Sequence, residues 1–136
     1  MNVYQLTLFL LIALVCHCNG KIPRCKCKNS LIPREWNGIA ARTNGCGAKS
    51  SGDIVPELWF HDCCLEHDRC YGTCNSDKFL CDAQFYSCMK HTCSTKGKIL
   101  TRLACYAAAP VYNDAVLQLG CRAWYASQNT YCTVPC

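Results

Sequence analysis

Four residues of the types used in acid–base and metal chemistry lie close together in this 136-residue chain. They are His67, Asp68, Tyr71 and Asp82. A neutral imidazole next to a carboxylate that can fix its tautomer is the setting of a general base. Asp68 directly follows His67, so on a helix it points about 100° away from it. The pattern predicts a base at His67 supported by Asp82, and a neighbouring task such as cation binding for Asp68.

The elements that must position these side chains are indicated by four cysteines. Cys63 and Cys70 are separated by the same seven-residue interval as Cys81 and Cys88. Two turns of helix rise about 10.5 Å, so each of two helices offers a matched pair of thiols. An antiparallel hairpin that turns at residues 72–76 brings Cys70 to Cys81 and Cys63 to Cys88 at disulfide distance.

The same register predicts where the polar residues meet. His67 lies level with Gln84, and Asp82 is offset from it by about 3 Å along the helix axis. Tyr71, one turn after His67, is equally close to Asp82. The hairpin therefore brings a base, a carboxylate and a phenol together.

The amino-terminal residues and the cysteine content indicate a secreted protein. Residues 6–15 form an apolar run that is too short for a membrane span, which needs about 20 residues. Small residues at 18 and 20 suit cleavage before Lys21, so we expect a secretory signal peptide over 1–20 and one domain over 21–136. Fourteen of the 16 cysteines remain after cleavage, which predicts an extracellular disulfide scaffold. The alternative, a zinc site formed by Cys63, Cys64, His67 and Cys70, conflicts with oxidation of thiols in the secretory route.

The rest of the sequence predicts helices and no strand of useful length. Val55-Pro56 is expected to open the first long helix, and Ser76 to cap the second. An apolar helical stretch follows over residues 99–109, and Pro110 is expected to start a further helix. The expected fold is mainly α: a small disulfide-rich domain built on an antiparallel helical hairpin, with additional C-terminal helices.

A family resemblance is carried by the central motif. The run Cys-Cys-Leu-Glu-His-Asp-Arg-Cys-Tyr over residues 63–71, followed by Cys81-Asp82 and Cys88, resembles the secreted phospholipase A2 family. The flanking Asn44-Gly45-Cys46-Gly47 and Leu119-Gly120-Cys121 are similar to its group XII branch. The resemblance implies hydrolysis of the sn-2 ester of a glycerophospholipid to a fatty acid and a lysophospholipid. It implies that His67 takes a proton from the attacking water, that Asp82 orients the imidazole, and that Tyr71 supports Asp82.

The resemblance also implies a Ca²⁺ site and a third disulfide, Cys46–Cys64. The implied ligands are the carboxylate of Asp68 and the backbone carbonyls of Gly45, Gly47 and Lys49. Lys49 stands where the family has its third glycine, which predicts weaker calcium binding. A loop that serves only as a structural turn is the alternative.

The expected partner is a phospholipid membrane surface, the source of the substrate; no nucleic acid is expected, and protein partners are left open. The net charge of +5 could favour an anionic membrane surface or belong to a solvated basic tail. Among Leu58, Trp59 and Phe60, one or two side chains could contact lipid instead of the core. Two other classes of function remain: a catalytically weak or inactive binding or toxin module with this fold, and a disulfide-rich growth factor or protease inhibitor.

Overall fold

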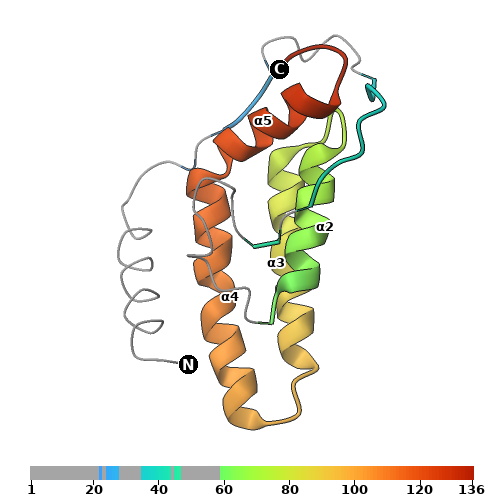
Figure 1. Cartoon of the computed structure of the whole chain (residues 1–136). Coiled ribbons are helices and arrows are strands. Elements are labelled where there is room, and N and C mark those ends of the chain that lie inside the picture. Colours follow the sequence, from blue (N-terminus) through green and yellow to red (C-terminus); the bar gives the residue numbers. More distant parts are fainter. Residues whose placement is uncertain (1–21, 23, 28–34, 44, 47–58) are drawn as a thin grey trace.

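The computed structural model describes residues 22, 24–27, 35–43, 45–46 and 59–136, and these residues form a mainly helical domain (Figure 1). Its helices are α2 (His61–Gly72), α3 (Lys78–Ser94), α4 (Ile99–Leu119) and α5 (Cys121–Tyr131). Within the described ranges no strand occurs, and one isolated antiparallel bridge joins Trp36 to Cys132. The predicted fold class is confirmed. The expected signal peptide lies outside the described residues.

The predicted helical hairpin is confirmed by its disulfides. Cys63 is bonded to Cys88 and Cys70 to Cys81, each with 5.7 Å between the Cα atoms. Because the first cysteine of α2 joins the later cysteine of α3, the two helices run antiparallel. The Cys46–Cys64 disulfide implied by the resemblance is also present. Four further pairs, for which spacing gave no assignment, are Cys25–Cys121, Cys27–Cys136, Cys74–Cys132 and Cys93–Cys105.

The cap of α3 differs from the one expected. Among the described residues α2 begins at His61; Trp59 lies in a turn, and Phe60 precedes the helix with its ring fully buried. Asp77, and not Ser76, caps α3: its Oδ1 accepts hydrogen bonds from the backbone N–H groups of Phe79 and Leu80. The start expected at Val55-Pro56 lies outside the described residues.

Helix α4 is continuous through Pro110, where a separate helix was expected to start. A proline inside a helix removes one backbone hydrogen bond and costs about 3 kcal/mol. Pro110 itself is exposed, whereas Ala108, Ala109 and Tyr112 are buried against the rest of the core. Burial of these neighbours along α3 therefore offsets the local cost and keeps the helix intact.

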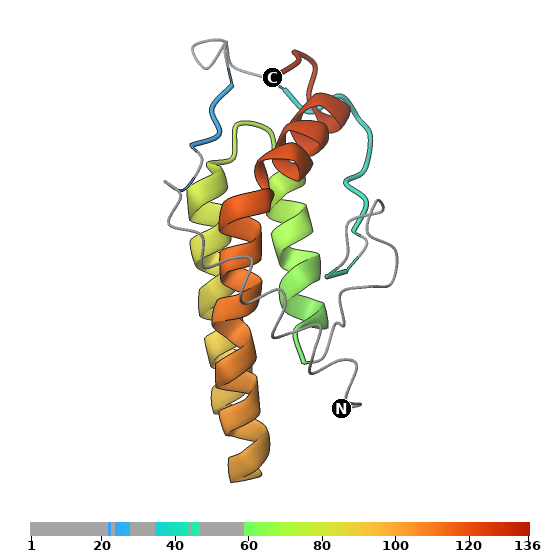
Figure 2. The same ribbon diagram turned by 90° about the vertical axis from the view of Figure 1, so that its left-hand side faces the viewer.

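The core fills the space between α2, α3 and α4. It is built on Phe60, Phe85, Met89 and Tyr112, together with buried cysteines. Helices α3 and α4 extend beyond α2, and α5 turns away from α4 to lie over the connection between α2 and α3 (Figures 1 and 2). No helix in the described part of the chain is both long and apolar enough to cross a membrane.

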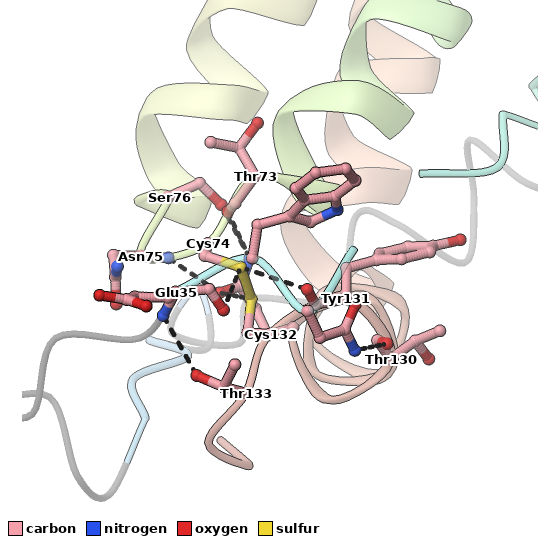
Figure 3. The surroundings of a disulfide bond; sticks show 12 residues. Glu35, Thr73, Cys74, Asn75, Ser76, Thr130, Tyr131, Cys132 and Thr133 are labelled. Carbon is pink, nitrogen blue, oxygen red and sulfur yellow. Dashed lines mark hydrogen bonds between the residues drawn. A yellow bond between two sulfur atoms is a disulfide. The ribbon is translucent and has the colours of Figure 1, made fainter. Parts of the chain in front are cut away.

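The turn between α2 and α3 is fixed to α5, as Figure 3 shows for the Cys74–Cys132 disulfide. Gln128 of α5 is fully buried and donates its amide to the carbonyls of Tyr71 and Thr73, at 2.7 and 2.8 Å. Its Oε1 accepts from the backbone N–H of Asn75, at 3.1 Å. The hairpin turn next to the candidate site is therefore held from a distant part of the sequence.

Candidate active site

Three residues predicted to meet do so in a buried cluster. The Nε2 atom of His67 lies 2.8 Å from Oδ1 of Asp82, and the hydroxyl of Tyr71 donates to the same oxygen at 2.7 Å. The exposed fractions of His67, Tyr71 and Asp82 are 8%, 4% and 1%. The α2–α3 disulfides set this register. His67 lies between Cys63 and Cys70 of α2, Tyr71 directly follows Cys70, and the α3 cysteines that pair with these two flank Asp82.

The hydrogen bond to Asp82 decides which nitrogen of His67 could act as a base. An ionised carboxylate only accepts hydrogen bonds, so the hydrogen of a neutral imidazole sits on Nε2 and leaves the lone pair on Nδ1. The imidazole packs against the rings of Tyr71 and Phe85, with centroid distances of 4.1 and 4.7 Å. These contacts restrict rotation of the ring and so keep Nδ1 in one orientation.

Lys78 completes the cluster and was not among the site residues predicted from the sequence. Its ammonium donates to Oδ2 of Asp82 at 2.6 Å and to the backbone carbonyl of Val116 at 2.8 Å. Only 5% of Lys78 is exposed. The i,i+4 spacing to Asp82 is a sequence signal for an ion pair on one helix. Its burial was not predictable, because α4 supplies the second acceptor.

The pKa values of the two acids in the cluster move in opposite directions. Burial acts to raise the pKa of Asp82, but hydrogen bonds from His67, Lys78 and Tyr71 and the charge of Lys78 outweigh it, so the pKa lies below its ordinary value. Burial, then the Asp82 charge and its hydrogen bond, raise the pKa of Tyr71 far above its ordinary value. Asp82 is therefore an anion, and Tyr71 a neutral donor, throughout the physiological range.

Gly120, between α4 and α5, closes one side of the cluster. A Cβ at this position would lie 2.6 Å from the Tyr71 hydroxyl oxygen and 3.0 Å from Cε of Lys78. Both distances are shorter than ordinary van der Waals contact, so the absence of a side chain lets the backbone approach the site closely.

A cleft of about 280 Å³ reaches the cluster between α2 and α3. His67 and Phe85 line it, as do the cysteines of both hairpin disulfides. Glu66 and Arg69, at its edge, form an ion pair with each other. The cleft gives His67 a route to solvent on this side of the hairpin.

The residues that the resemblance assigns to calcium are only partly within the described chain. Asp68 is half-buried on α2, one turn after Cys64. The disulfide from Cys64 to Cys46 brings the loop backbone to this helix, with 5.0 Å between the Cα atoms, and Gly45 has a φ of +76°. Gly47 and Lys49 lie outside the described residues.

The donors present fit a hard cation. Oxygen is the ligand atom that calcium prefers, and a carboxylate combined with backbone carbonyls supplies it. Across the described ranges, no group of three or more His, Cys, Asp or Glu side chains is arranged to hold a metal. The zinc alternative is wrong, because Cys63, Cys64 and Cys70 are all in disulfides.

The side chains considered for lipid contact, and the two other tryptophans, have different environments. Phe60 belongs to the core, and Trp59 packs against it while half-buried. Trp124 is buried near the hairpin turn, whereas 62% of Trp36 is exposed. Leu58 lies outside the described residues. Only Trp36 of these described aromatics therefore presents a largely exposed side chain.

Comparison with known proteins agrees with the family resemblance that the central motif carries. A family model described as group XII secretory phospholipase A2 precursor matches residues 7–136. The group XIIA secretory phospholipase A2 of Mus musculus is 36% identical over 117 residues, or 80% of this chain and 59% of the mouse protein. The Homo sapiens protein of that name is 36% identical over 97 residues, covering 65% of this chain and 50% of the human one.

A third relative is named a phospholipase A2-like protein and not a phospholipase A2. The group XIIB secretory phospholipase A2-like protein of Mus musculus is 32% identical over 121 residues, or 80% of this chain and 61% of that protein. The chain thus spans between 50% and 61% of the length of these three relatives. No solved structure matches the chain.

Proposed function

This chain belongs to the group XII secretory phospholipase A2 family, and we propose on that basis that it is a secreted, calcium-dependent phospholipase A2. The reaction would be hydrolysis of the sn-2 ester of a glycerophospholipid to a fatty acid and a lysophospholipid. The observation that carries the proposal is the buried imidazole of His67, held 2.8 Å from an Asp82 carboxylate that also accepts from Tyr71.

The roles of the residues follow from their hydrogen bonds. Because Nε2 of His67 faces Asp82, Nδ1 would take the proton from a water molecule as its oxygen bonds to the ester carbonyl carbon. The proton would then pass from Nδ1 to the alkoxide of the departing lysophospholipid. Asp82 would stabilise the imidazolium formed in between, and Tyr71, which stays protonated, would hold the carboxylate throughout.

Calcium would be held by Asp68 and by the carbonyls of Gly45, Gly47 and Lys49. Bound there, the ion would supply positive charge to the developing oxyanion and to the substrate phosphate. What supports this assignment is the Cys46–Cys64 disulfide, which anchors the loop one turn away from Asp68 on α2. Lys49, in place of a glycine, favours weak binding.

The substrate would be met at a phospholipid membrane surface outside the cell. An exposed face of α4 supports this partner, since Ile99, Leu100 and Leu103 are each more than half exposed there. No Asp or Glu occurs from residue 83 to residue 113, and Lys98 lies beside the apolar side chains. Apolar side chains with neighbouring cations suit an anionic bilayer. The secretory names of the relatives and the disulfide-rich fold support an extracellular location.

A phospholipase-like binding module is the second candidate. Two observations favour it: one relative is named a phospholipase A2-like protein, and Lys49 departs from the glycine of the family's calcium loop. Retention of the complete His67–Asp82–Tyr71 cluster opposes it. The two candidates differ in turnover and not in fold.

The test is release of fatty acid from vesicles by the purified secreted chain. Vesicles with different labelled acyl chains at sn-1 and sn-2 would be incubated with calcium or with a chelator. We expect release of the sn-2 chain that depends on calcium. Vesicle binding without any release would reject the enzyme and favour the binding module, and release that is unaffected by the chelator would reject the calcium role.

A further inference from the structure

The Asp82 carboxylate presents each of its oxygens to a different set of donors. Oδ1 accepts from His67 and Tyr71, whereas Oδ2 accepts from the ammonium of Lys78 at 2.6 Å. That ammonium also donates to the Val116 carbonyl at 2.8 Å. Lys78 therefore connects the carboxylate on α3 to the backbone of α4.

Stability alone gives little reason for a lysine here. Desolvating two charges is costly, and a buried ion pair often contributes no more than apolar residues of similar volume. Lys78 and Asp82 are 5% and 1% exposed, so both bear that cost. Apolar side chains in place of both partners would avoid this cost, whereas an apolar residue at position 78 alone would leave Asp82 as a buried anion without its cation.

The geometric effect of Lys78 is specific. A carboxylate can rotate about its Cβ–Cγ bond, because this terminal torsion is broad. With Oδ2 held by the ammonium, Oδ1 is directed at both His67 and Tyr71. The Val116 carbonyl in turn restrains the flexible lysine side chain, so the orientation of the carboxylate depends on α4.

We infer that Lys78 is a positioning residue: anchored by the Val116 carbonyl, it fixes the Asp82 carboxylate so that Oδ1 orients the His67 ring. The effect on turnover rests on the proposed function of His67, but the effect on the hydrogen bond does not. Lys78 acts through Asp82 and contacts neither the water nor the ester. Substitution should reduce kcat while KM and the calcium Kd stay nearly unchanged.

The first experiment compares Lys78→Met with a control on the same helix, Lys90→Met. Lys90 is exposed and lies over the Tyr86 ring, 4.7 Å from its centroid. Proton NMR would follow the His67 ring N–H that is hydrogen-bonded to Asp82, assigned by its loss in His67→Gln. In Lys78→Met we expect this resonance to shift or broaden and kcat to fall about 10- to 100-fold. Lys90→Met should change neither.

A folded Lys78→Met variant that keeps both the wild-type resonance and the wild-type kcat would overturn the inference, even if it were less stable. Because removal of the lysine leaves a buried anion, the substitution would also be made in an Asp82→Asn background, where no charge is left unpaired. There we expect Lys78→Met to change the residual kcat less than about two-fold, because the Asp82 carboxylate that Lys78 orients is absent. A ten-fold loss in that background would contradict the inference.

The two proposals can fail separately. If the wild-type chain hydrolyses no phospholipid, the proposed function fails, while the His67 resonance still reports whether Lys78 positions Asp82. If hydrolysis occurs and the resonance in Lys78→Met is unchanged, the proposed function stands and the inference is wrong.

Discussion

Replacing Tyr71 with phenylalanine should lower the free energy of unfolding by about 1.5–3 kcal/mol at neutral pH, the range for a hydrogen bond to a charged group. The Tyr71 hydroxyl donates to Oδ1 of Asp82 at 2.7 Å, in a site where both side chains are almost fully buried. Phenylalanine keeps the ring and its contact with His67, so little packing is lost. His67 and Lys78 still bond to the carboxylate, which prevents a larger loss.

The loss should depend on pH in a defined direction. Because the pKa of Asp82 is lower in the folded state, its ionised form stabilises the fold above the unfolded-state pKa of about 3.9, and this contribution is lost as pH falls through the folded-state value. Tyr71 is one cause of the lowered pKa. The difference in stability between wild type and Tyr71→Phe should therefore be full at pH 7 and shrink below about pH 4.

The assay is guanidinium chloride unfolding with the disulfides intact, at a series of pH values from 7 to 2. Equal unfolding free energies for wild type and Tyr71→Phe at pH 7 would refute the hydrogen bond to an anionic Asp82. A difference that persisted undiminished at pH 2 would refute the role of the charge, because protonated Asp82 is a weaker acceptor.

Three further substitutions test other parts of the site. His67→Gln should lower hydrolysis by about 10²- to 10⁴-fold, the usual contribution of a general base, while calcium binding measured by calorimetry persists; unchanged hydrolysis would exclude His67 as the base. Asp68→Asn should weaken calcium binding and activity together, and unaltered calcium affinity would place the ion elsewhere. Gly120→Ala should destabilise the protein by about 1–3 kcal/mol, because the added Cβ would clash with the Val116 carbonyl oxygen and would also crowd Tyr71 and Lys78, whereas Gly97→Ala, with nothing within 4 Å of the added Cβ, should not. Equal melting temperatures for the two alanine variants would contradict the close approach at Gly120.

The sequence by itself determined the hairpin and the His67–Tyr71–Asp82 cluster within it. Cysteines at equal seven-residue intervals admit one antiparallel register, and the structure has that register. His67, Tyr71 and Asp82 lie within one or two turns of those cysteines, so their meeting followed from helix geometry alone. The prediction was possible because each distance depended on a short piece of regular helix.

Tertiary structure decided what depends on contacts between distant residues. The second acceptor of Lys78 lies 38 residues away on α4, and nothing near position 78 indicates that the side chain is buried. Pro110 was expected to start a helix from its local properties, yet the packing of its neighbours on α3 keeps α4 continuous. Three of the remaining four disulfides span 58 to 109 residues, and their pairings depend on how α5, the amino-terminal segment and the end of the chain meet the rest of the domain. Spacing carries no information about those long-range contacts, because each is set by the packing of whole elements.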